Sequence, residues 1–330
     1  MKTRLRFAPS PTGNLHVGNA RTALVNYLFC RSISGEMMLR IDDTDEERSK
    51  KEFEENIKSD LNWMGIFWEM SDRQSTRIKN YNDALNKLFE SGRAYRCYET
   101  QEELSLKRKA QLMSGKPPVY DRQGLSLQQK DHEKFANEGK LPHWRFKLTD
   151  DEVVWDDLIR GKCTYDMRSL SDPVIMREDG RPIYTLASVV DDIDHEITHI
   201  IRGEDHVTNS AAQIQLFKAL GIQPPSLGHL SLIAGSEGEG LSKRLGSLSL
   251  GQLKQEGLES NALTSLLAKL GTSDPISFIE NIEGLIKDFD LKKFSRNTAK
   301  FDMKDLYLLN KKSIQSMSYQ AALKLSLIHI

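Results

Sequence analysis

The chain has 330 residues, 38% of them hydrophobic, and its 46 Lys and Arg against 47 Asp and Glu leave a formal net charge of −1. This composition is typical of a folded globular chain and excludes a disordered tail. The length predicts two or three packed modules rather than a single core. No run of eighteen or more apolar residues occurs, so no membrane span is expected.

The cysteines and the N-terminus indicate the compartment. Cys30, Cys97 and Cys163 are odd in number and far apart, which argues against a disulfide framework and predicts a reduced, cytoplasmic environment. Residues 1–7 lack the apolar stretch of a signal peptide. Residues 1–31 hold five basic residues and no acidic one, so a polyanion could bind there, although solvated helix faces also drift in charge.

The first elements form a βαβ pattern. Residues 4–8 and 37–41 are predicted as short buried strands, and residues 19–32 between them carry apolar side chains at helical spacing. A strand, a glycine-bearing turn, a helix and a strand within about 40 residues predict a parallel pair. Amphipathic helices are predicted at 53–63 and 81–89.

The middle of the chain departs from this pattern. Residues 99–143 are charged, rich in glutamine and interrupted by two consecutive prolines, which indicates an insertion into the first domain. Residues 173–184 predict a strand, a Glu-Asp-Gly turn and a second strand. Alternating elements resume over 187–232, and the pattern after residue 248 is helical.

Residues 9–19, Pro-Ser-Pro-Thr-Gly-Asn-Leu-His-Val-Gly-Asn, follow a predicted strand and begin a helix. Gly13 and Gly18 would let the backbone approach a ligand closely. A helix start presents free N–H groups and the positive end of its dipole, so an anion is expected there. His16 could donate a hydrogen bond to a phosphate oxygen, although a lone histidine at such a turn is more often an ordinary polar residue.

Residues 235–244, Gly-Ser-Glu-Gly-Glu-Gly-Leu-Ser-Lys-Arg, predict a glycine-rich loop with two cations. Such a loop suits a polyphosphate whose negative charge grows during a reaction. A P-loop is excluded, because Leu241 stands where its lysine belongs. A flexible surface turn is the alternative interpretation.

Together the two segments resemble the paired signatures of class I aminoacyl-tRNA synthetases. Residues 16–19, His-Val-Gly-Asn, are similar to the HIGH motif, and residues 241–244, Leu-Ser-Lys-Arg, to the KMSKS motif. Further segments resemble bacterial glutamyl-tRNA synthetases in sequence and order. They are residues 6–13, 40–45, 184–192 and 201–206.

The resemblance implies an α/β fold: a Rossmann-like parallel-sheet catalytic core, an α+β acceptor-binding insertion and a C-terminal helical stem-contact domain. The expected bounds are 1–85 and 186–247 for the two halves of the core, 86–185 for the insertion, 248–324 for the helical domain and 325–330 for a non-native tail. Relatives continue into a helical anticodon-binding region, so the resemblance also predicts that this chain is a fragment lacking that region.

The resemblance further implies a glutamate–tRNA ligase that uses ATP and Mg²⁺ to form glutamyl-adenylate and then esterifies tRNA(Glu), with tRNA(Gln) left open as a second acceptor. A cytoplasmic monomer is expected. The residues that match the glutamate site are Arg6, Ser10, Asp42, Tyr184 and Arg202. The residues that match the ATP site are His16, Gly18, His206, Ser242 and Lys243, with His16 and Lys243 as the catalytic pair.

Elementary chemistry agrees with these matches. A fork from Arg6 or Arg202 could hold a substrate carboxylate and separate glutamate from neutral glutamine, although Asp42 or Glu204 could also pair with either arginine internally. Lys243 would neutralise charge on the departing pyrophosphate. No protein nucleophile is required, since the substrate carboxylate itself attacks phosphorus.

The sequence departs from the family pattern at several positions. Asp42 stands where the family usually has Glu, Ser188 where Asn is common, and Gly240 where a first lysine often lies. Some members carry a zinc knuckle that begins with Cys-x-Cys. Residues 97–99, Cys-Tyr-Glu, break that motif, and residues 120–122, Tyr-Asp-Arg, lack its later cysteine, so no zinc is predicted.

Two other groups of residues are interpreted as structural rather than functional. His195 and His199 are four residues apart beside aspartates, but the alternation around Ile197 predicts a strand that would separate them, so no metal site is expected. The aromatic group Trp63, Phe67 and Trp68 is interpreted as core rather than as a stacking platform.

Three rival functions stay open. The first is a short paralogue that glutamylates a modified tRNA base, and such paralogues lack the helical domain to which residues 301–310 correspond. The second is a glutaminyl-tRNA synthetase, which the signature details disfavour. The third is a catalytically silent nucleotide- or tRNA-binding homologue, against which the retained His16 and Lys243 argue.

Overall fold

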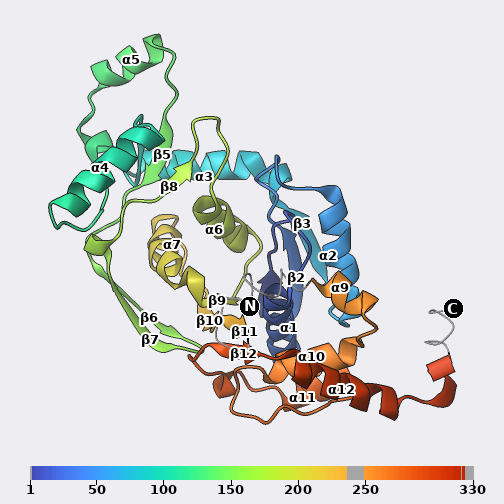
Figure 1. Ribbon diagram of the computed structural model, residues 1–330. Helices are drawn as coiled ribbons and strands as arrows, with labels where there is room; N and C mark the ends of the chain where they lie inside the picture. Colours follow the sequence, from blue (N-terminus) through green and yellow to red (C-terminus); the bar gives the residue numbers. More distant parts are fainter. Residues whose placement is uncertain (1, 236–248, 321, 324–330) are drawn as a thin grey trace.

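The computed structural model describes residues 2–235, 249–320, 322 and 323 (Figure 1). Its centre is a five-stranded parallel sheet in the order β10-β9-β1-β2-β3. The strands are β1 Arg4–Phe7, β2 Glu36–Ile41, β3 Met70–Arg73, β9 His199–Gly203 and β10 Ser226–Leu230. The predicted parallel pair and the Rossmann-like fold class are confirmed, since β1 runs parallel to β2 from Arg4 opposite Glu36 onward.

Helices cover both faces of this sheet. The first face packs against α1 Val17–Ser32 and α2 Lys51–Trp63, and the second against α3 Ile78–Glu90, α6 Tyr184–Asp194 and α7 Val207–Ala219. Successive side chains of a strand point to opposite faces. Leu5 and Phe7 therefore join the core beside α1, whereas Met38 joins the core beside α6. The same alternation turns Arg6, Arg40 and Arg202 toward α6 and α7.

The insertion lies at one side of the core (Figure 1). It contains an antiparallel sheet of β4 Ala94–Cys97, β5 His143–Phe146 and β8 Val174–Met176, together with α4 Gln101–Met113 and α5 Gln129–Asn137. A hairpin of β6 Glu152–Asp157 and β7 Gly161–Asp166, which we did not predict, runs from the insertion toward the C-terminal helices (Figure 1). Short 3₁₀ helices occur at Gln74–Arg77, Gln123–Ser126, Met167–Ser169, Glu204–His206 and Leu291–Lys293.

The predicted strand-turn-strand over 173–184 is only half correct. The turn forms, with the Gly180 amide donating to the Arg177 carbonyl. The second strand is reduced to one bridge between Met176 and Pro182, because α6 already begins at Tyr184. Proline also has no amide hydrogen to extend the ladder.

The helical pattern predicted after residue 248 is confirmed. It consists of α9 Leu250–Gln255, α10 Ser260–Lys269, α11 Ile282–Asp288 and α12 Met303–Ser316, with β12 Ala299–Phe301 pairing to β11 Ile233–Gly235. Leu263 and Leu266 of α10 share one hydrophobic core with α1. Within the described residues, no helix has the length and apolar character needed to cross a membrane.

The three aromatic residues near the end of α2 have different environments. Trp63 and Trp68 pack against the core, as predicted. Phe67 does not, because its side chain is 56% exposed.

Candidate active site

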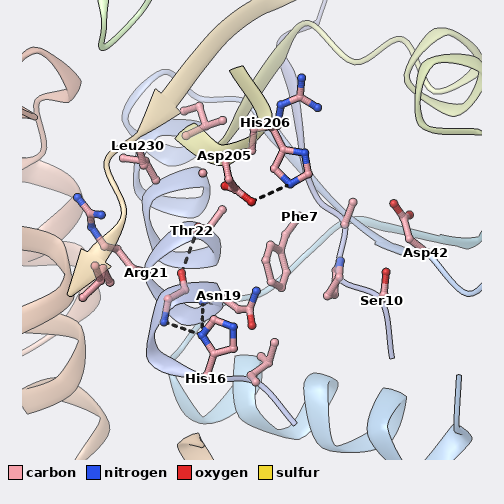
Figure 2. Close-up of a pocket in the computed structure, with 18 of the residues that line it drawn as sticks. Phe7, Ser10, His16, Asn19, Arg21, Thr22, Asp42, Asp205, His206 and Leu230 are labelled. Carbon is pink, nitrogen blue, oxygen red and sulfur yellow. Dashed lines mark hydrogen bonds and ion pairs between the residues drawn. The ribbon is translucent and has the colours of Figure 1, made fainter. Parts of the chain in front are cut away.

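A cavity of about 630 Å³ opens at the carboxyl ends of β1, β2, β9 and β10, where parallel sheets commonly bind ligands (Figure 2). All the predicted site residues that the structure describes line it. They are Arg6, Ser10, His16, Gly18, Asp42, Tyr184, Arg202 and His206. Ser242 and Lys243 fall within residues 236–248, outside the described part of the chain.

His16 is the N-cap of α1. Its Nδ1 accepts hydrogen bonds from the amides of Gly18 at 3.1 Å and Asn19 at 3.4 Å (Figure 2). Because Nδ1 is an acceptor, the neutral ring carries its proton on Nε2, where it can be donated to a ligand oxygen. Desolvation lowers the pKa of His16, which favours this neutral form. A Cβ on residue 18 would lie 2.9 Å from the His16 ring, so this cap requires glycine there.

Arg202 projects from β9 into the cavity with only neutral partners among the described residues. Its Nη1 donates to the Tyr184 hydroxyl at 2.7 Å, and its Nη2 donates to Ser210 Oγ at 2.6 Å and Gln213 Oε1 at 2.7 Å. The residue is 6% exposed. A buried guanidinium without a carboxylate is costly, so the site is electrostatically prepared for an anionic ligand.

Arg6, in contrast, already has an internal counter-ion. Its Nε and Nη2 donate to the two carboxylate oxygens of Asp192 at 3.1 and 3.4 Å. The sequence left Asp42 or Glu204 open as an alternative internal partner, and neither takes that position: Asp42 accepts from Arg40, and Glu204 pairs with Arg160 at 2.6 Å. The sequence could not choose among these carboxylates, because the order of the strands decides which ones meet.

Arg40 joins the acidic residues into one buried network. Its side chain is fully buried, and it donates to Asp42 Oδ1 at 2.7 Å, Asp42 Oδ2 at 3.1 Å and Asp192 Oδ1 at 2.7 Å. Burial raises the pKa of Asp42 to about 6, although Arg40 opposes the shift. For Asp192, burial acts in the same direction, but Arg6 and Arg40 outweigh it and hold the pKa below its usual value.

His206 completes the wall opposite His16 (Figure 2). Its ring lies 5.3 Å from the Tyr184 ring, and its Nε2 lies 3.6 Å from Asp205 Oδ2. Burial and the nearby Arg202 charge lower the pKa of His206, so the ring is neutral near pH 7. It can therefore stack on or donate to an uncharged part of a ligand without adding a cation.

Sequence reasoning missed several polar residues of this region. Arg40 and His229 each interrupt an apolar stretch, and that interruption was the available signal, since a polar side chain in a buried strand needs a partner. Asp192 lies in the acidic run 191–194, Asp-Asp-Ile-Asp, which did not single it out. Arg21, on α1, is 2% exposed and donates to the Ser231 carbonyl at 2.6 Å and the Leu270 carbonyl at 3.0 Å. Burial lowers the pKa of Arg21 to about 10.

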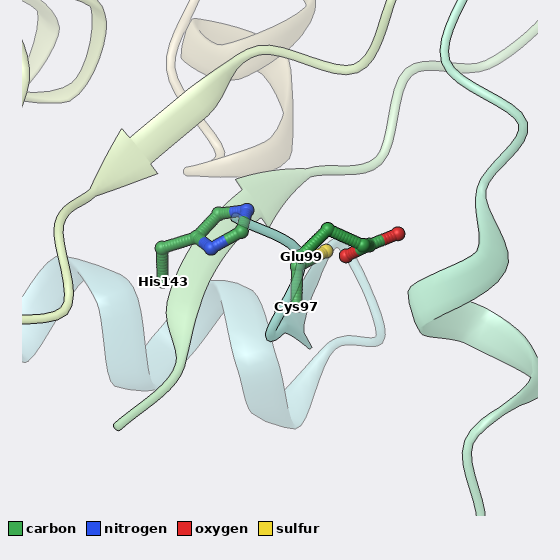
Figure 3. A group of neighbouring side chains, drawn as sticks. All are labelled: Cys97, Glu99 and His143. Atoms are coloured by element: carbon green, nitrogen blue, oxygen red, sulfur yellow. The ribbon is translucent and has the colours of Figure 1, made fainter. Parts of the chain in front are cut away.

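The insertion holds a separate cluster of Cys97, Glu99 and His143, whose possible ligand atoms all lie within 4.8 Å of one another (Figure 3). The sequence pointed only to Cys97 and Glu99, because His143 lies far along the chain, at the start of β5. Two of its members have an internal partner: the Tyr120 hydroxyl donates to Glu99 at 2.7 Å and lies 3.4 Å from the Cys97 sulfur, whereas Nε2 of His143 is buried without a hydrogen-bond partner among the described residues. Burial raises the pKa of the Cys97 thiol to about 11, so the thiol is protonated in the chain described here.

His195 and His199 fall in different elements, but not through the strand that we predicted around Ile197, because β9 begins only at His199. His195 caps the C-terminal end of α6, and its Nε2 lies 2.9 Å from Asp72 Oδ2. His199 begins β9, and its Nδ1 lies 2.8 Å from the Thr198 hydroxyl.

A parallel sheet with an inserted α+β module, a histidine-capped first helix and a ligand cavity at the carboxyl edge defines a class I synthetase-like catalytic domain. The family described as tRNA synthetases class I (E and Q), catalytic domain, matches residues 2–308. The chain belongs to this family.

Individual relatives agree with that assignment. Glutamate–tRNA ligase 1 of Maricaulis maris (strain MCS10) is 52% identical over 321 residues, covering 97% of this chain and 72% of the relative. Glutamate–tRNA ligase of Azospirillum brasilense is 51% identical over 321 residues, with the same two coverages. A crystal structure of a glutamate tRNA ligase from Elizabethkingia meningosepticum CCUG26117, in complex with its amino acid, matches 97% of this chain and 71% of that chain with a TM-score of 0.89 and 33% identity.

Proposed function

We propose that the chain is a glutamate–tRNA ligase. Its substrates are glutamate, ATP and tRNA(Glu). The α-carboxylate of glutamate attacks the α-phosphorus of ATP, a new acyl–phosphate bond forms, and the bond to pyrophosphate breaks. A hydroxyl of the terminal adenosine of tRNA then attacks the activated carbonyl, and AMP leaves. The observation that carries this proposal is Arg202, a buried cation facing the cavity with neutral partners.

Arg202 and Tyr184 select the substrate side chain. A guanidinium fork binds a carboxylate with two parallel charged hydrogen bonds, whereas the amide of glutamine would place an N–H donor against an arginine donor. Asp42 binds the substrate ammonium group, because a carboxylate engaged by Arg40 still has free lone pairs. Ser10 lies at the exposed rim of the same site, and Arg6 fixes the acidic network through Asp192.

The ATP site uses the other half of the cavity. His16 donates from Nε2 to a phosphate oxygen, Gly18 lets the phosphates approach the start of α1, and His206 contacts the nucleoside. Ser242 and Lys243 act on the pyrophosphate, where a positive charge stabilises the transition state. Mg²⁺ accompanies the nucleotide and neutralises part of its phosphate charge.

The remaining assignments extend this proposal. Residues 86–185 bind the acceptor stem and residues 248–324 contact the stem of the tRNA. The enzyme is a cytoplasmic monomer and takes no zinc in the insertion. Cys30, Cys97 and Cys163 are free cysteines, which fits a reducing compartment, and the Tyr120 hydrogen bond to Glu99 supports the metal-free insertion.

ATP–pyrophosphate exchange and tRNA charging test the function. With bacterial tRNA present, glutamate should support exchange and glutamine should not. The charged product should carry an ester on its terminal adenosine that mild alkali removes. Exchange that prefers glutamine would contradict the carboxylate fork. Glutamate attached to an internal base would favour the base-modifying paralogue, and no exchange with any amino acid would favour a silent homologue.

A further inference from the structure

A buried row of side chains continues behind Arg202, away from the cavity. Ser210 Oγ, which accepts from Arg202, lies 2.8 Å from Nε2 of His229. Nδ1 of His229 bonds in turn to Oδ2 of Asp157. Arg202 Nε also lies 3.5 Å from His229 Nε2. The side chains of His229 and Asp157 are fully buried, so water does not substitute for any of these bonds.

Three elements that are distant in sequence contribute to this row. Ser210 belongs to α7, His229 to β10 and Asp157 to the end of β6 in the hairpin of the insertion. The hairpin is fixed to the core where the Leu158 amide donates to the Leu227 carbonyl at 2.8 Å. The orientation of Asp157 is determined further by the amides of Ile159, Arg160 and His229, which donate to Oδ1 at 3.0 to 3.1 Å.

These contacts fix where the protons lie. Burial raises the pKa of Asp157, but the His229 bond and the backbone amides outweigh it and lower the pKa to about 2, so the residue is ionised. An ionised carboxylate only accepts, and His229 Nδ1 must therefore carry the proton. Nε2 is then a lone-pair acceptor, which suits the Ser210 hydroxyl and the Arg202 Nε–H. The opposite tautomer would point an N–H at the guanidinium.

We infer that Asp157 and His229 are positioning residues for glutamate selection by Arg202, an inference that rests on the proposed function. A carboxylate in direct contact with Arg202 would orient it but would also neutralise it and compete with the substrate. In the row, Asp157 instead selects the His229 tautomer whose Nε2 is an acceptor toward Ser210 and Arg202. The guanidinium keeps its fork aimed at the cavity and its charge available for a carboxylate.

Two substitutions of His229 separate positioning from simple structural support. In His229→Gln, the amide oxygen can take the place of Nε2 and accept from Ser210, while the donor to Asp157 is lost. In His229→Asn, the amide nitrogen can take the place of Nδ1 and donate to Asp157, while the acceptor near Arg202 is lost. Positioning predicts that His229→Asn raises the KM for glutamate about tenfold, the loss expected for one hydrogen bond to a charged group, and that His229→Gln raises it much less. The KM for ATP should change less than twofold in both.

If His229 only supports the structure, His229→Gln should be more damaging than His229→Asn. It would free the hairpin from the core and lower the melting temperature further than His229→Asn does. Asp157→Asn should also raise the KM for glutamate, since its amide can force the other histidine tautomer. Arg160→Gln is the matched control: it loosens the same hairpin by removing the pair with Glu204 but leaves the row intact, so the KM for glutamate should not change.

The experiment is glutamate-dependent ATP–pyrophosphate exchange by the full chain with tRNA present, combined with thermal melts of each variant. The expected result is a selective rise in the KM for glutamate in His229→Asn and Asp157→Asn. An unchanged KM in folded His229→Asn, or equal effects of Asn and Gln, would overturn the inference alone. Absence of exchange by the wild-type chain would overturn the proposed function, and the inference with it.

Discussion

Replacement of two buried arginines should separate ligand binding from stability. Arg202 and Arg40 face the same side of the sheet, but Arg202 has neutral partners among the described residues, whereas Arg40 forms ion pairs with three carboxylates. In Arg202→Met, the lost neutral hydrogen bonds are offset by removal of an unpaired buried cation, so the free energy of unfolding should change by only about 1 kcal/mol. Its kcat/KM for glutamate should fall by roughly 10²–10³, or about 3–4 kcal/mol, because the substrate carboxylate loses its partner.

Arg40→Met should behave in the opposite way. It leaves Asp42 and Asp192 buried with less positive charge, which should lower the free energy of unfolding by about 3–5 kcal/mol. Urea unfolding followed by circular dichroism measures stability, and glutamate-dependent pyrophosphate exchange measures activity. If Arg202→Met proves as unstable as Arg40→Met, or retains its kcat/KM for glutamate, then Arg202 is a structural arginine and the reasoning from its unpaired charge is wrong.

Three further predictions concern the proposed substrate site. His16→Ala removes the helix cap and should lower the free energy of unfolding by about 1 kcal/mol, and it should abolish most of the exchange activity. His16→Asn should restore the cap but not the activity. Thermal melts and exchange rates of the two variants check this prediction. Lys243→Ala should lower the exchange rate by about 10²–10³ with an unchanged melting temperature, and near-wild-type adenylate formation would contradict the assignment of that loop. The pKa of Asp42 is raised to about 6 from an ordinary 3.8, so ionisation of this carboxyl lowers the stability of the fold as the pH rises from about 4 to about 6. Below about pH 6 the protonated group should bind the substrate ammonium poorly. The KM for glutamate should therefore rise on acidification in the wild-type chain but not in Asp42→Asn.

Local patterns in the sequence determined the elements that depend on near neighbours. Apolar spacing located β1, α1 and β2, and the turn with His16 and Gly18 located the start of α1, because caps and periodicity act over a few residues. The family resemblance supplied residues for the site, and all those that the structure describes line one cavity. The hairpin β6–β7 was missed, and the second strand predicted before residue 184 is only an isolated bridge at Pro182, since both depend on what the segment packs against.

The tertiary structure alone decided which charges meet. Arg6, Arg40 and Arg202 are equally basic in the sequence, yet Arg6 and Arg40 share Asp192 while Arg202 reaches neutral hydroxyl and amide groups. Those pairings join residues up to 186 positions apart, and strand order and helix packing bring them together. The energy of a charge in a protein depends on burial and on counter-ions within a few ångströms. Neither quantity is a property of a residue and its sequence neighbours. The sequence therefore shows the three arginines, and the fold determines which of them has no carboxylate partner among the described residues.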